Sequence, residues 1–266
     1  MPFPDSPRVI YNINPLDQVI CQLRFPPILS IDKKIPYEFQ EFIRNEYPLY
    51  FEEKELLNGA PLEVFSQISH DSTRDLLLQS TEKMNYRFDS ADGDWAIHLT
   101  NNFIALIAKK YDRWENFVSH LELPLRAFEE IYHPLFYSRI GLRYIDVIQR
   151  SKLNLEKSDW TDLIQPYILG ILAANNIDKS IVKNSLGTDE IFLDDNKGLV
   201  RIVHGLVISK QNNETVYIID SDYFTEKQTE TQDALSKLNE FNHKGRRLFR
   251  WCITDFLHGA LQPESL

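Results

Sequence analysis

Alternating hydrophobic and polar residues predict the strands of this protein. In Gln18–Phe25 hydrophobic side chains such as Leu23 alternate with polar ones such as Gln22 and Arg24, which is typical of a half-buried strand. An Asp-Gly pair within Ser90–Asp94 predicts a hairpin turn. The other strand-like segments are Leu62–Ser69, Leu76–Phe88, Trp95–Tyr111, Ser138–Val147, Ile181–Leu186 with Ile191–Leu193, Gly198–Ser209 and Thr215–Phe224.

Hydrophobic residues three and four positions apart predict helices between these strands. Such spacing follows Pro36, a residue type that suits the first turn of a helix, and stops before Pro48. The same spacing recurs in three further segments, Asp112–Tyr132, Asp159–Ala174 and Thr229–Leu261. The last helix would be roughly 50 Å long at 1.5 Å per residue, and Gly245 is a candidate bend within it.

The order of the predicted elements occurs twice. After an extended, proline-rich lead-in at residues 1–15, a β-α-β-β-β-α order fills residues 16–135 and again residues 136–266. Leu23-Arg24-Phe25 in the first opening strand matches Leu142-Arg143-Tyr144 in the second. Because a helix buries its hydrophobic stripe on a sheet face, we expect an α+β fold. In it, a tandem duplication of two closely joined units would form a curved, mainly antiparallel sheet packed on long helices.

Composition and charge exclude several classes of protein. The 266 residues are 12% aromatic, more than disordered chains carry, and the two cysteines lie far apart, which excludes a disulfide or zinc framework. No stretch approaches the ~18 apolar residues of a membrane span, and the N-terminus lacks the apolar core of a signal peptide. We therefore expect a cytoplasmic protein that binds no membrane. The net charge of −10 disfavours duplex DNA as a partner.

Arginines on the sheet form the first candidate site. Arg139 and Arg143 fall on one face of their strand because side chains alternate with a period of two, and Arg24 is the repeat counterpart of Arg143. Guanidinium groups bind carboxylate or phosphate through paired hydrogen bonds, so these three residues could form an anion site. Alternatively, each arginine pairs with a neighbouring Asp or Glu on the sheet.

Carboxylates near the end of a later strand form the second candidate site. Asp220 and Asp222 share one strand face and Glu226 lies just beyond them, a pattern that could hold Mg²⁺ or Mn²⁺. No glycine-rich phosphate loop accompanies them, and acidic residues are also common before a helix N-terminus. A structural role is therefore the alternative, and we predict no bound cofactor.

Basic residues on the last predicted helix form the third candidate site. Arg246 and Arg250 lie one turn apart and Arg247 is adjacent, so the three could bind an acidic partner or RNA. The alternative is a solvated helix face, because Glu240 and Lys244 are spaced as an ordinary i,i+4 ion pair.

The reactive residue types give no catalytic pattern. Cys21 lies on an apolar strand face and Cys252 on an apolar helix stripe, so both are interpreted as core thiols. His204 lies among hydrophobic residues of its strand and is interpreted as a buried, hydrogen-bonded histidine. Whether the protein is an enzyme stays open, since acid and base residues can be distant in sequence.

Several stretches resemble a sporadically distributed family of uncharacterised prokaryotic proteins of similar length. They are Asn14–Phe25, Phe39–Pro48, Tyr111–Phe117, Arg139–Asp146, Ile219–Tyr223 and Phe249–Asp255, and the resemblance covers essentially the whole chain. It implies no mechanism, but its patchy distribution suggests mobile-element cargo such as phage-defence or toxin–antitoxin loci. Members often have an Asn where Ile145-Asp146 stands, so no role is assigned to Asp146.

Two classes of function follow from these observations. The first is a non-catalytic binding protein with a protein partner, as an accessory or neutralising component of such a locus. The second is a small-ligand or nucleotide-binding module, or a metal-dependent enzyme, with its site near Arg24, Arg143, Asp220 and Asp222. Duplex DNA binding by a saddle-shaped repeat is least favoured by the charge, and homo-oligomers stay possible.

Overall fold

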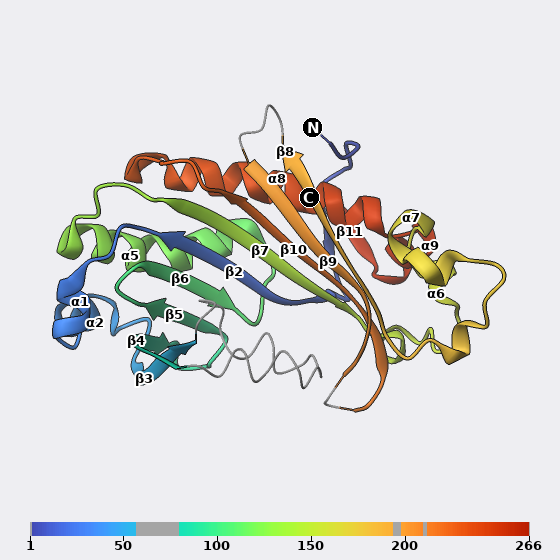
Figure 1. The fold of residues 1–266 in the computed structure, drawn as a ribbon, viewed down its shortest axis with the longest axis horizontal. Coiled ribbons are helices and arrows are strands. Elements are labelled where there is room, and N and C mark those ends of the chain that lie inside the picture. The colour runs from blue at the N-terminus through green and yellow to red at the C-terminus, as the bar shows by residue number, and fades with distance from the viewer. Residues whose placement is uncertain (1, 57–79, 194–197, 210–211, 266) are drawn as a thin grey trace. The chain divides into compact units, whose positions relative to one another are not determined.

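The computed structural model describes residues 2–56, 80–193, 198–209 and 212–265 of the chain. Within these ranges a nine-stranded sheet has the order β3-β4-β5-β6-β2-β7-β10-β9-β8 (Figure 1). Its strands are β2 (Leu16–Arg24), β3 (Leu49–Leu56), β4 (Ser80–Asp89), β5 (Trp95–Leu99), β6 (Phe103–Ala108), β7 (Arg139–Ile148), β8 (Ser185–Leu193), β9 (Gly198–Ile208) and β10 (Thr215–Thr225). The strand predicted over Leu62–Ser69 lies outside the described residues.

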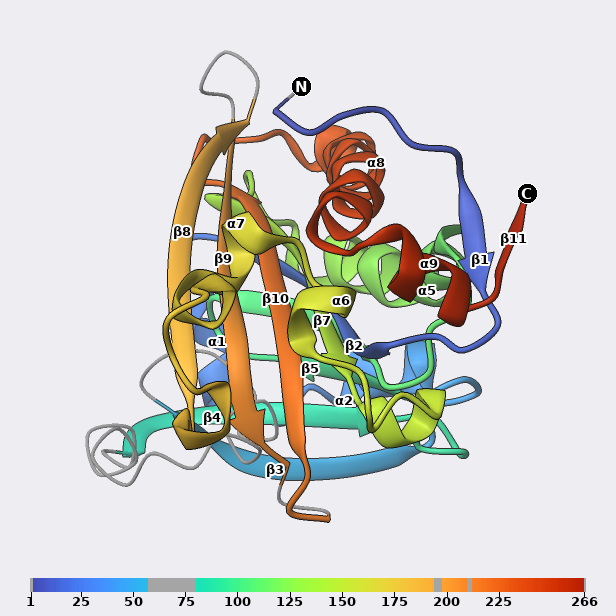
Figure 2. The ribbon, with the colours of Figure 1, turned by 90° about the vertical axis from the view of Figure 1, so that its right-hand side faces the viewer.

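α-Helices, a two-stranded ribbon and short 3-10 helices at Arg150–Leu153, Gly170–Ala173, Lys179–Ile181 and Thr231–Asp233 complete the described elements. The helices are α1 (Leu29–Lys33), α2 (Tyr37–Ile43), α5 (Trp114–Tyr132), α6 (Trp160–Leu163), α7 (Pro166–Leu169), α8 (Ala234–Cys252) and α9 (Asp255–Ala260). The ribbon pairs β1 (Val9–Tyr11) with β11 (Pro263–Ser265), near the two chain ends (Figure 2). The α+β prediction is confirmed: a large, mostly antiparallel sheet packs against helices. No described helix is both long and apolar enough to cross a membrane.

Contacts divide the chain into two compact units. One, called the α5 unit, contains residues 18–142 and 225–238; the other, called the α8 unit, contains residues 1–17, 143–224 and 239–266. In the α5 unit, α5 buries an aromatic stripe beneath the sheet: Phe117 contacts Trp95 with ring centroids 6.0 Å apart, and Phe128 contacts Phe25 at 4.6 Å. This stripe is the one expected from the helical spacing of Asp112–Tyr132.

In the α8 unit, helix α8 approaches β7 closely at Gly245. A Cβ atom at Gly245 would lie 2.8 Å from Cε2 of Tyr144, so only glycine fits against this ring. The Tyr144 hydroxyl donates a hydrogen bond to Oδ1 of Asn242 at 2.9 Å, one turn before the glycine. The helix continues through Gly245, which therefore serves close packing within a continuous helix.

The prediction of one helix over Thr229–Leu261 is wrong, because α8 ends at Cys252 and α9 starts at Asp255. A neighbouring segment supplies the backbone partners at this break: Ile253 forms an antiparallel bridge with Ile164, and the Gln165 amide donates to the Cys252 carbonyl at 2.9 Å. The hydrophobic periodicity runs on through α9, so the break has no signature in the pattern.

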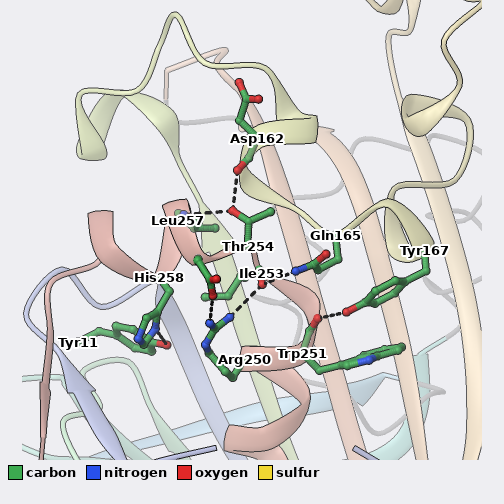
Figure 3. Close-up of polar contacts among 11 residues, drawn as sticks. Tyr11, Asp162, Gln165, Tyr167, Arg250, Trp251, Ile253, Thr254, Leu257 and His258 are labelled. Carbon is green, nitrogen blue, oxygen red and sulfur yellow. Dashed lines mark hydrogen bonds and ion pairs between the residues drawn. The ribbon is translucent and has the colours of Figure 1, made fainter. Parts of the chain in front are cut away.

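Thr254 then caps the new helix, and this contact predicts a measurable stability effect. Its hydroxyl accepts a hydrogen bond from the Leu257 amide at 3.2 Å and donates one to the Asp162 carbonyl at 2.6 Å (Figure 3). We expect Thr254→Ala to lower the free energy of unfolding by about 1 kcal/mol, measured by urea unfolding. Thr254→Ser keeps the hydroxyl and should stay near the wild-type value; an equal loss for both variants would contradict the cap.

Two other predicted elements are interrupted. The helix expected over Asp159–Ala174 is broken into α6 and α7 at Ile164, since Pro166 lacks an amide hydrogen and starts a new helix. The strand expected over Trp95–Tyr111 is the β5–β6 hairpin, in which the Thr100 amide donates to the Phe103 carbonyl at 2.9 Å. The Asp-Gly turn between β4 and β5 is confirmed, with Gly93 at a φ of 75°.

Candidate binding face on helix α8

Arg143 on β7 forms an ion pair with Asp220 on β10. Arg143 donates two hydrogen bonds to Asp220, from Nε to Oδ1 at 2.6 Å and from Nη2 to Oδ2 at 2.5 Å. Burial lowers the pKa of Arg143, but the hydrogen bonds and charge of Asp220, together with the charge of Asp222, outweigh it and raise the pKa overall. This is the pairing expected as the alternative to an anion site at Arg143.

Arg24 and Arg139 meet at a neutral side chain in the α5 unit. Both donate to Oε1 of Gln22, Arg24 from Nε at 2.9 Å and Arg139 from Nη1 at 3.4 Å. The Arg139 side chain lies along its own strand over Gly141, where a Cβ atom would be 2.3 Å from its Nη1. The structure thus brings Arg24 and Arg139 together around Gln22.

The three predicted metal ligands have different surroundings. Asp220 is engaged by Arg143, and Asp222 contributes to the same electrostatic environment. Glu226 is exposed and belongs to the α5 unit. Among the described residues no three His, Cys, Asp or Glu side chains are placed to hold a metal ion.

The three arginines of α8 have different surroundings. Arg250 donates to the Ile253 carbonyl at 3.2 Å and pairs with Asp255, so it fixes the break between α8 and α9 (Figure 3). Arg247 pairs with the N-terminal segment, its Nη2 lying 2.7 Å from Oδ1 of Asp5. The Nε atoms of Arg246 and Arg247 are buried with no hydrogen-bond partner in the described part of the chain.

Positive charges gather around His243 on this stretch of α8. Burial lowers the pKa of His243 first, and the positive charges of Arg246, Arg8 and Arg247 lower it further. Each of the three arginines is therefore close enough to His243 to disfavour its protonated form. On a chain of net charge −10 this is a local reversal of sign.

An aromatic surface continues this basic stretch. Trp251 follows Arg247 by one helical turn, and Tyr167 stacks on the Trp251 ring with centroids 4.4 Å apart and planes at 27° (Figure 3). The Tyr167 hydroxyl donates to the Trp251 carbonyl, which holds the stack in place although Tyr167 is 55% exposed. We call this surface the α8 binding face; it is formed by Arg8, Tyr167, His243, Arg246, Arg247 and Trp251.

The solvated helix face, given as the alternative interpretation of the basic residues, does not hold for Lys244. Lys244 pairs with Glu240 at 2.5 Å, as the i,i+4 spacing indicates, but its side chain is only 2% exposed. It lies on the inward stripe of α8 with Phe241 and Leu248, both buried. The basic segment therefore has a buried side at Lys244 and a partly exposed side at Arg246 and Arg247.

Sequence reasoning missed the residues that come from outside α8, and it set aside Asp146. Arg8 precedes β1 and Tyr167 lies on α7, and no local pattern connects either of them to α8. Asp146 is buried, and burial followed by the charge of Asp220 raises the pKa of its carboxyl. The available signal was its phase on β7, where it shares a face with Leu142 and Tyr144.

The predicted core residues are confirmed. Cys21 and Cys252 are buried, and burial raises the pKa of both thiols, which keeps them protonated. His204 is buried and contacts the Tyr217 hydroxyl through Nδ1 at 3.2 Å and Oδ2 of Asp189 through Nε2 at 3.0 Å. These side chains stabilise the interior.

No protein-family model matches the chain, and no curated protein matches it. The family resemblance therefore stays a prediction.

Proposed function

We propose that this protein is a non-catalytic binding protein whose α8 binding face captures an acidic segment of a protein partner. The observation that supports this most is the gathering of Arg8, His243, Arg246 and Arg247 beside the exposed ring of Tyr167 on an acidic chain. Like charges held together destabilise one another, and a bound anion relieves that repulsion. The role suits an accessory or neutralising component of a mobile defence or toxin–antitoxin locus, which the family resemblance implies.

The chemistry of the face favours a peptide over a nucleic acid or a small ligand. Nucleic-acid affinity grows with the number of phosphates neutralised, and the net charge of −10 opposes that growth. The ligand or metal alternative needs Arg143 and Asp220 to be available, but each already satisfies the other. Arginine and aromatic side chains are the residue types that dominate protein interfaces.

Charge reversal on α8 tests this proposal. We expect a fluorescent peptide rich in Glu, Asp and Phe to bind the wild-type chain, and Arg246→Glu/Arg247→Glu to weaken binding at least about tenfold, because two charge-assisted contacts are lost. Fluorescence anisotropy at two salt concentrations gives the affinity and its electrostatic share.

A matched control separates the local effect from net charge. Arg44→Glu/Lys110→Glu changes the charge by the same amount at two exposed positions, with side chains 56% and 82% exposed, and should leave binding within about threefold. Equal losses for both double variants would reject the α8 face. Tighter binding of a single-stranded RNA of equal charge would reject an acidic protein as the partner.

We also propose that the two halves of the chain arose by duplication, as the element order indicates. Two features support it: in each half the opening strand neighbours the strand before the long helix, β2 beside β6 and β7 beside β10. Arg24 and Arg143, the matching arginines, both lie one residue after a buried leucine. The duplication would be contradicted by a crystal structure in which Arg24 and Arg143 fail to superpose when residues 16–135 and 136–266 are aligned.

A further inference from the structure

The segment before β1 already occupies part of the α8 binding face. Residues 2–8 contain no helix or strand, and Phe3 is buried while its neighbours Pro2, Pro4 and Asp5 are exposed. The Phe3 ring packs against Trp251 with centroids 5.4 Å apart. The Asp5 carboxylate pairs with Arg247 at 2.7 Å. In Figures 1 and 2 the segment passes α8 before it enters β1.

The two contacts have the same spacing on helix α8 and on the N-terminal segment. Arg247 and Trp251 are four residues apart on a helix, which separates them by about 6 Å along its axis. Phe3 and Asp5 are two residues apart in an extended segment, which separates them by roughly 6.5 Å. Prolines at positions 2, 4 and 7 favour the extended backbone that this match requires.

The ion pair between Asp5 and Arg247 is easily displaced. The Asp5 side chain is 78% exposed, and exposed ion pairs contribute little to stability. The buried Phe3 ring on Trp251 is therefore a stronger anchor than this ion pair. The following residues stay attached through β1 and β11, so a released segment remains tethered beside the face.

We infer that the α8 binding face recognises an extended segment with an aromatic residue and a carboxylate two positions later, and that Phe3 and Asp5 act as its intramolecular competitor. The inference rests on the proposed function and specifies its partner: a protein that presents an aromatic-x-acidic motif. The partner's aromatic ring takes the place of Phe3 on Trp251, and its carboxylate takes the place of Asp5 on Arg247.

A peptide with the sequence of residues 2–7 serves as the probe, because Phe3 and Asp5 contact the face while Arg8 belongs to it. We expect the full-length Phe3→Ala/Asp5→Asn variant to bind this peptide at least about tenfold more tightly than the wild-type chain, since a tethered competitor has an effective concentration near the millimolar range. Adding Trp251→Ala to that variant should abolish binding, and adding Trp251→Phe should retain most of it. A peptide with Ala for Phe3 and Asn for Asp5 is the control.

The outcomes separate this inference from the proposed function. Equal affinities of the wild-type chain and the Phe3→Ala/Asp5→Asn variant would overturn the competitor role. Absence of binding to the variant, while the acidic peptide binds the wild type in an Arg247-dependent way, would overturn the motif but keep the proposed function. A wild-type dimer that dissociates in the variant, seen by size-exclusion chromatography, would also overturn the inference, because the segment would then be a contact between two copies.

Discussion

Asp220→Ala is expected to lower the free energy of unfolding by about 3–5 kcal/mol. The substitution removes the carboxylate that accepts both hydrogen bonds from Arg143, whose side chain is only 22% exposed. A guanidinium buried on the sheet would then lack its main counter-charge, and the cost of desolvating it would no longer be offset. Urea unfolding followed by circular dichroism measures the change.

The double variant Arg143→Met/Asp220→Leu distinguishes a broken ion pair from a damaged sheet. Replacing both charges with apolar side chains removes the uncompensated charge, so its stability should return to within about 1 kcal/mol of the wild type. A double variant as unstable as Asp220→Ala would show that the pair is not the cause.

A further variant, Asp222→Asn, separates ion pairing from metal binding. If Asp220 and Asp222 held Mg²⁺ or Mn²⁺, the wild-type melting temperature would rise with the ion and Asp222→Asn would remove the rise. Because Asp220 already accepts both hydrogen bonds from Arg143, we expect no ion-dependent rise in the wild type. A rise that Asp222→Asn abolishes would support the metal alternative.

Hydrophobic periodicity within a segment was enough to predict some of the elements. β2 and α5 emerge as expected: Val19, Cys21 and Leu23 are buried at every second position of β2, and the buried residues of α5 recur at helical spacing. β3 was missed: it lies at one edge of the sheet formed by the described residues, and its sequence Leu-Tyr-Phe-Glu-Glu-Lys-Glu-Leu lacks a long alternating hydrophobic face. The end of α8 at Cys252 depends on backbone bonds from Gln165, far away in sequence, and no window around Cys252 contains that information.

In the candidate sites, too, the sequence predicted local spacing but not the contacts between residues distant in sequence. Alternation placed Arg143 on a face away from Tyr144, but only the strand order brings Asp220 within hydrogen-bond distance. Helical spacing grouped Arg246 and Arg250, yet Arg250 serves the end of its own helix. The α8 binding face includes Arg8 and Tyr167, residues distant in sequence that no short motif connects to α8.

Asp146→Asn is the second large effect expected, and it has the opposite sign: the variant should be more stable than the wild type at neutral pH. Asp146 is buried on β7, and burial followed by the charge of Asp220 raises the pKa of its carboxyl. The unfolded chain titrates this group near a pKa of about 3.9. Above that pH, the folded protein must either hold a proton or bury a charge, while the unfolded chain need do neither.

The pH dependence follows from proton counting. Between the unfolded and the folded pKa the folded state holds one more proton than the unfolded state, so stability falls as pH rises, by up to about 1.4 kcal/mol per pH unit. Asparagine has nearly the shape of the protonated acid and no charge to bury. We therefore expect the two proteins to be equally stable near pH 4 and to diverge as the pH rises above 4 in urea titrations.

Asp92→Asn gives a control of opposite sign. The Ser90 hydroxyl donates to Asp92 at 2.6 Å and the Asp94 amide at 3.0 Å, and these bonds lower the pKa of an exposed carboxyl. Its ionised form is favoured in the folded state, so Asp92→Asn should lose stability above pH 4, where Asp146→Asn gains it. A loss of stability in Asp146→Asn that is equal at every pH would contradict this prediction. The carboxyl would then act through its shape or a hydrogen bond. A group that stays protonated only in the folded state must instead make the free energy of unfolding depend on pH.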